Sequence, residues 1–131
     1  MTIGRFVGSI WLLAAIGYGC AFDLADVNYS PTKFQVSDMS EQSFTLTRKV
    51  PLKDTPCWYS RELQPLIQWQ LVGSVAEGDV FRSKNQTLTL ECSNIYEAYL
   101  VVREGHLVGF YLPVQKGFVG IAEPVQLPLK Q

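Results

Sequence analysis

Apolar and polar residues alternate along much of the chain, which is the pattern of half-buried β-strands. The clearest case is the segment LIQWQLVGSV at 66–75, where apolar side chains at Ile67, Trp69 and Leu71 are separated by glutamines. Runs of turn-forming residues, such as SDMSEQ and KNQ, separate such segments. The pattern predicts further strands at 33–36, 43–52, 80–83 and 87–92.

The segment 95–114 predicts a β-hairpin. Two runs rich in β-branched and aromatic residues flank the dipeptide Glu104-Gly105, whose glycine is suited to a tight turn. A two-residue loop at this position sets Arg103 opposite His106, and that pair fixes the register of the whole hairpin.

Both faces of this hairpin are apolar. Regular alternation places Tyr96 and Tyr111 on one face, and it places Glu97 opposite Leu112 on the other. Two interpretations remain open. Either other segments, such as 118–129 or an irregular loop, cover the hairpin on both sides, or its tyrosine-bearing face binds a partner.

Helical periodicity is weak after residue 22. The segment 53–65 contains Pro56 and Pro65 and is irregular, with room for a single short helix at Ser60–Gln64. The predicted fold class is all-β, a small antiparallel β-sandwich or partly open β-barrel of about seven or eight strands. We expect one β-rich domain at 33–131, preceded by a lead-in or tether at 22–32.

The N-terminus has the three-part layout of a secretory signal peptide. Arg5 precedes the apolar block IWLLAAI at 10–16, and the small residues GYGCA follow. The apolar block is shorter than the ~20 residues of a spanning helix, so a retained anchor is the weaker alternative. Residues 1–21 are therefore expected to be a signal peptide, and the protein is expected to be exported.

Around Cys20 the sequence GYGC resembles the lipobox of bacterial lipoproteins, although Gly17 stands where leucine is usual. The resemblance implies cleavage before Cys20, lipid attachment to its sulfur, and a tether to the membrane. The expected location is then the periplasm or outer membrane of a bacterium. Cleavage after Ala21 instead implies a freely soluble periplasmic or secreted protein.

Removing or acylating Cys20 leaves two cysteines, Cys57 and Cys92. In an exported chain such a pair is expected to form a disulfide bond. Closing a loop of about 36 residues would stabilise the fold by up to about 4 kcal/mol. Two buried free thiols are the alternative.

Charge and residue types argue against several functions. The formal net charge is −1 and basic residues are scattered, whereas nucleic-acid binding needs a basic face. The sequence has one histidine, His106, at an exposed turn, and the carboxylates Glu77 and Asp79 flank a turn glycine. No motif for a metal, a cofactor or a catalytic nucleophile is present. The chain is therefore predicted not to be an enzyme.

The segment PCWYSRE at 56–62 is the best candidate for recognition, because Trp58, Tyr59 and Arg61 are residue types that dominate binding interfaces. Packing of Trp58 over the disulfide is the alternative. The leading hypothesis is a non-catalytic envelope protein, an inhibitor, immunity protein or accessory subunit, that binds a protein through this loop, the hairpin tyrosines, or both. The alternatives are a carrier of small apolar ligands and a small exported hydrolase without a recognisable motif.

Overall fold

A computed structural model describes residues 27–37, 42–52, 61–85 and 87–130, and the regular structure in these ranges is entirely β. All strand pairings are antiparallel, so the predicted all-β fold class is confirmed. The strands are β1 Ser30–Pro31, β2 Gln35–Val36, β3 Ser43–Leu46, β4 Val50–Leu52, β5 Arg61–Leu63, β6 Trp69–Val75, β7 Gly78–Ser83, β8 Thr89–Glu91, β9 Ile95–Glu97, β10 Tyr99–Arg103, β11 His106–Leu112, β12 Gly117–Gln126 and β13 Leu129–Lys130.

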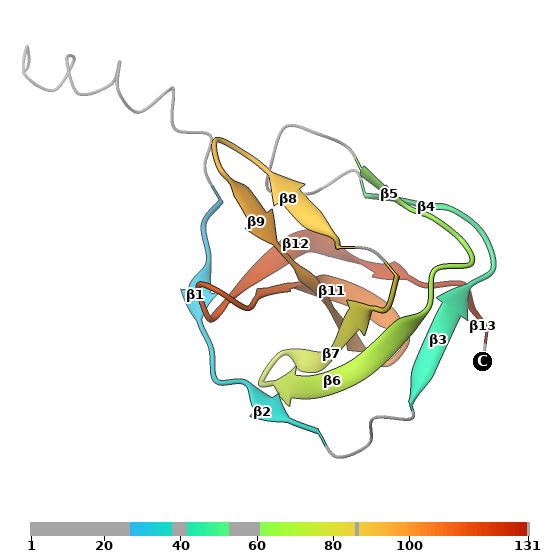
Figure 1. Cartoon of the computed structure of the whole chain (residues 1–131), viewed down its shortest axis with the longest axis horizontal. Coiled ribbons are helices and arrows are strands. Elements are labelled where there is room, and N and C mark those ends of the chain that lie inside the picture. Colours follow the sequence, from blue (N-terminus) through green and yellow to red (C-terminus); the bar gives the residue numbers. More distant parts are fainter. Residues whose placement is uncertain (1–26, 38–41, 53–60, 86, 131) are drawn as a thin grey trace, which may run out of the picture.

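Most strands belong to one large sheet with the order β1-β12-β11-β10-β7-β6-β3-β13, and β2 also pairs with β6. The remaining strands form two separate two-stranded ribbons, β4–β5 and β8–β9, which lie at the top of the view in Figure 1. The sheets do not close into a barrel, and the arrangement is compatible with a small β-sandwich.

The main core lies between one face of the large sheet and the two ribbons. Trp69 from β6 and Phe110 from β11 are its largest fully buried side chains. The β4–β5 ribbon contributes Leu63, and the β8–β9 ribbon contributes Leu90. Burial of these side chains against the sheet stabilises the ribbons, because isolated two-stranded ribbons are only marginally stable.

The opposite face of the sheet carries a second, smaller apolar cluster of Val75, Val80, Val101 and Tyr111. The segment 27–37, which we name the N-terminal strap, covers part of it. The ring of Phe34 stacks on Tyr111 with centroids 5.1 Å apart. The hairpin is thus covered on both sides, but not by strand β12 of the segment 118–129, which pairs edge to edge with β11.

Two glycines provide the close approach that the strap needs. A Cβ atom at Gly73 would overlap the ring of Phe34 and the backbone oxygen of Gln35, and one at Gly117 would overlap the ring of Tyr29. The strap is also held by Thr32, whose hydroxyl donates a hydrogen bond to Glu77 over 3.0 Å. Part of the predicted lead-in therefore packs on the sheet.

The hairpin turn is confirmed, with Arg103 opposite His106 and with positive φ at Glu104 and Gly105. Beyond the turn, the register predicted from regular alternation is wrong. A β-bulge at Val108 shifts the register, so Tyr99 lies opposite Tyr111. Because one extra residue reverses every later side chain, Tyr111 faces the second cluster and not the main core.

The hairpin is also shorter than predicted. Residues Ile95–Glu97 leave it and pair with β8, so Glu97 lies opposite Thr89 and not opposite Leu112. The backbone N–H of Ala98 extends this pairing by donating to the carbonyl of Leu88. The expected pairing of Glu97 with an apolar face is therefore wrong.

Two further expectations are corrected. No helix forms in the described part of Ser60–Gln64, because Arg61–Leu63 is strand β5, which pairs with β4 and buries Leu63. The predicted strand 43–52 is split into β3 and β4, which belong to different sheets. Among the residues that the structure describes, no helix is long and apolar enough to cross a membrane.

Candidate functional site

Several residues singled out from the sequence lie outside the described ranges. These are Cys20, Cys57, Trp58 and Tyr59. Arg61 is the first residue of β5, so the candidate loop leads directly into a strand of the β4–β5 ribbon. Cys92 follows β8 and is half-buried against the main core. Its pairing with Cys57 stays a prediction.

The two hairpin tyrosines do not form one surface. Tyr96 is half-buried and packs against the main core, whereas Tyr111 belongs to the second cluster and is only 5% exposed. Burial raises the pKa of Tyr111 above its ordinary value of 10.0, and the neighbouring Tyr99 raises it further. Tyr111 is therefore placed to stabilise the fold beneath Phe34.

The residues considered for catalysis are dispersed. The His106 ring nitrogen Nδ1 lies 2.9 Å from the backbone oxygen of Glu104, within its own turn. Glu77 accepts the hydrogen bond from Thr32, and Asp79 lies two residues further along the chain, in β7. Within the described ranges, no group of three histidine, cysteine or carboxylate side chains could hold a metal ion.

A hollow of about 90 Å³, which we name the β5–β8 hollow, lies between the two ribbons. Glu62, Leu63 and Gln64 line one side, and Thr87, Leu88 and Thr89 line the other. Trp69 contributes to the wall from the main core, and its buried indole N–H has no hydrogen-bond acceptor. The hollow thus combines a polar rim with an apolar base.

The β5 side of this hollow is an open strand edge. Glu62 lies directly opposite Pro51, which has no N–H, so the two residues cannot exchange a pair of hydrogen bonds. The bonded pairs are therefore the flanking ones. The N–H and C=O of Glu62 point away from β4, toward an edge with which no described strand pairs.

The β8 side is open in the same way. The N–H of Ala98 donates to Leu88, and the N–H of Cys92 donates to Asn94, which sets the alternation of bonded pairs along the β8–β9 ribbon. Thr89 falls between bonded pairs, so its N–H and C=O point away from β9. The outward backbone groups of Glu62 and Thr89, with which no described strand pairs, therefore border one hollow.

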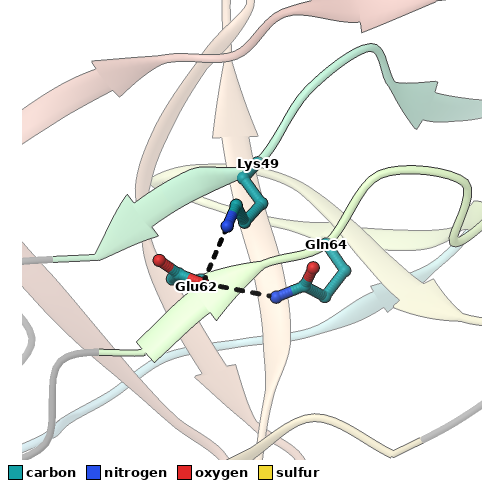
Figure 2. A network of polar contacts seen from close by, with 3 residues as sticks. All are labelled: Lys49, Glu62 and Gln64. Atoms are coloured by element: carbon teal, nitrogen blue, oxygen red, sulfur yellow. Dashed lines mark hydrogen bonds and ion pairs between the residues drawn. The ribbon is translucent and has the colours of Figure 1, made fainter.

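Exposed side chains on the β5 side form a small polar group (Figure 2). The Lys49 ammonium lies 3.9 Å from the Glu62 carboxylate, and the Gln64 amide donates to the same oxygen over 3.5 Å. The long distances and high exposure mean that this group adds little to stability. It leaves polar groups available at the rim.

Leu66 lies in the chain between Gln64 and Ile67, which line the β5–β8 hollow, and is 86% exposed. Its φ of 73° lies in the left-handed region, which costs a non-glycine residue about 1–2 kcal/mol. Backbone strain of this kind clusters at functional sites.

A second hollow, of about 160 Å³, lies at the other end of β7. Phe44 and Phe81 form its aromatic wall, with ring centroids 4.8 Å apart. Asp79 and Glu104 are also among its lining residues. We name it the Phe44–Phe81 hollow.

The sequence did not reveal the roles of Glu62, Thr89 and Trp69. Pro51 was the available signal, because a proline within a strand has no N–H. It cannot exchange a pair of hydrogen bonds with the residue opposite it on the neighbouring strand. Which strand lies opposite Pro51 depends on tertiary pairing, which alternation cannot supply.

Comparison with known proteins finds no matching family model, no similar curated protein and no similar solved structure.

Proposed function

We propose that this chain is a non-catalytic, exported cell-envelope protein that binds a partner protein by pairing with an extended segment of it. The segment adds to the open edge of β5. The observation that carries this proposal is the outward direction of the backbone groups of Glu62 and Thr89, on two strand edges that border one hollow.

Strand addition suits such an edge because main-chain hydrogen bonds give affinity while side-chain pockets give specificity. The β5–β8 hollow, about 90 Å³ in volume, has room for one side chain of the added segment. The exposed groups of Lys49 and Gln64 supply polar contacts at the rim. Leu66 supplies an apolar contact beside it.

The loop singled out from the sequence supports the same location. Trp58, Tyr59 and Arg61 immediately precede Glu62 in the chain. A Cys57–Cys92 disulfide would join the segment before β5 to the residue after β8. It would thereby hold together the two sides of the hollow and reduce the entropy lost on binding.

The alternative functions have less support. Cavities that hold drug-sized ligands usually span about 300–1,000 Å³. The two hollows, at about 90 and 160 Å³, are smaller. A hydrolase of the Ser-His-Asp or Cys-His type would need His106 beside a nucleophile, and its ring nitrogen lies against the carbonyl of Glu104 instead.

Export by the N-terminal leader is part of the proposal. If Cys20 carries lipid, seven peptide steps separate it from Val27, which is buried in the main core. The fully extended chain spans at most about 25 Å over that length. The domain would then work close to the membrane surface. Its partner would be an envelope protein, which this protein would inhibit, neutralise or assist.

Photo-crosslinking in living cells of the native host tests this function. A photoreactive phenylalanine analogue replaces Gln64, beside the β5 edge, or Glu123, an exposed residue of β12 that serves as the control. We expect one major adduct from position 64 and none at the same mass from position 123. Equal adducts from both positions, or none from position 64, would rule out the β5 edge as the binding site.

A further inference from the structure

The Phe44–Phe81 hollow is distinct from the β5–β8 hollow and has its own chemistry. It is formed by residues from β3, β7, β10, the β10–β11 turn and β13. Phe44, Phe81 and Val102 are each at most 7% exposed and form its apolar interior. An interior of this kind takes an apolar group that enters from solvent.

A carboxylate faces the same side as this interior. Asp79 lies directly opposite Val102 in the pairing of β7 with β10, so both side chains are on the face of the main core. Phe81, two residues further along β7, shares that face. Asp79 is exposed and therefore stands where the hollow opens to solvent.

Glu104 adds a second carboxylate at the β10–β11 turn. Its φ of 52° is in the left-handed region, in which asparagine or glycine is more usual. The N–H of Leu127 donates to the carbonyl of Gly105 over 3.0 Å and fixes the turn beside the hollow. The backbone position of Glu104 beside the hollow is therefore set by the fold.

Within the described part of the chain, no basic side chain lines this hollow or forms an ion pair with these carboxylates. The neighbouring cations Arg103 and Lys130 alternate with Val102 and Leu129, so they belong to the opposite face of their strands. Two acidic residues and two aromatic rings therefore line one hollow that no described basic side chain lines.

We propose that the Phe44–Phe81 hollow binds an organic cation on an alkyl stem, either a free alkylamine or a lysine side chain. Aromatic rings and carboxylates both attract such a cation. A cavity of about 150 Å³ accommodates a benzene-sized group, so the volume of about 160 Å³ fits a butylammonium group. The site does not depend on the β5 edge.

Nuclear magnetic resonance titration of the purified protein with n-butylammonium tests the proposal, with n-butanol as the neutral control. We expect saturable millimolar binding that shifts the ring signals of Phe44 and Phe81, with butanol about tenfold weaker. The double variant Asp79→Asn/Glu104→Gln should also bind butylammonium about tenfold more weakly. Glu123→Gln, which removes an exposed carboxylate elsewhere, should bind it as the wild type does.

Equal binding of butanol, unchanged binding by the double variant, or no shift at either ring would overturn the proposal. A lysine blocked at both backbone ends distinguishes the two sources of the cation. Tighter binding than butylammonium assigns the site to a protein side chain, and weaker binding assigns it to a free amine. Failure of this titration leaves the crosslinking test at Gln64 unaffected.

Discussion

Replacing Gly73 by alanine is expected to lower the free energy of unfolding by about 3 kcal/mol, the upper range for overpacking a closely packed site. The added Cβ would overlap the ring of Phe34 and the backbone oxygen of Gln35. Since a backbone atom is involved, rotation of one side chain cannot relieve the overlap. The N-terminal strap must move away, and the stacking of Phe34 on Tyr111 is then lost.

Urea unfolding followed by circular dichroism measures this effect. Gly120→Ala is the matched control, because its nearest non-adjacent neighbour is a Phe118 ring carbon at 3.3 Å, and we expect a change below about 1 kcal/mol. Phe34→Ala combined with Gly73→Ala should cost less than the sum of the single changes, since both remove the same contact. Strict additivity, or a Gly73→Ala change as small as the control, would show that the strap does not pack on the sheet.

Replacing Trp69 by alanine is expected to lower the free energy of unfolding by about 3–5 kcal/mol. Trp69 is 2% exposed, is among the largest fully buried side chains, and contacts the base of the β5–β8 hollow. Its removal would leave a cavity between the large sheet and the ribbons. Trp69→Phe should cost less, because it keeps most of the apolar volume and removes a buried N–H that has no acceptor.

The same urea titration, followed by circular dichroism, ranks these variants. Leu66→Ala is the control for a large apolar residue outside the core, since Leu66 is 86% exposed. It should change the stability by less than about 0.5 kcal/mol. A loss below about 1 kcal/mol for Trp69→Ala would contradict the packing described for the main core.

The alternation of apolar and polar residues predicted the individual strands well where one face of the strand is buried and the other is exposed to solvent. Trp69 and Leu71 are buried in β6 while Gln68 is exposed, as the pattern indicates. The dipeptide Glu104-Gly105 likewise predicted the hairpin turn, because the local demand for positive φ is visible in the sequence.

The other predictions of the fold failed where the structure depends on tertiary pairing. The bulge at Val108 exchanges the faces of β11, and nothing in an apolar run marks which residue is extra. The split of 43–52 into β3 and β4 depends on two different partner strands. Phe34 was the signal for the strap, but its position over Gly73 requires strands that are distant in sequence.

The candidate site was located only in part. The loop 56–62 drew attention to residues just before β5, yet the open edge at Glu62 follows from its pairing with Pro51. Hydrogen-bond direction at a strand edge depends on which residues lie opposite each other, and residue types do not encode that directly.

Binding of the crosslinked partner to Glu62→Pro and Glu62→Gln tests the strand-addition claim most directly. Proline removes the outward N–H without removing a bond to β4, whereas glutamine keeps the backbone and changes only the charge. We predict that Glu62→Pro weakens binding about tenfold or more while Glu62→Gln stays within about threefold of the wild type. Thr87→Arg, which fills the hollow from the β8 side, should also weaken binding. This second variant tests the claim independently if Glu62→Pro does not fold. Equal affinity of Glu62→Pro and Glu62→Gln, with both folded by circular dichroism, would contradict strand addition at β5.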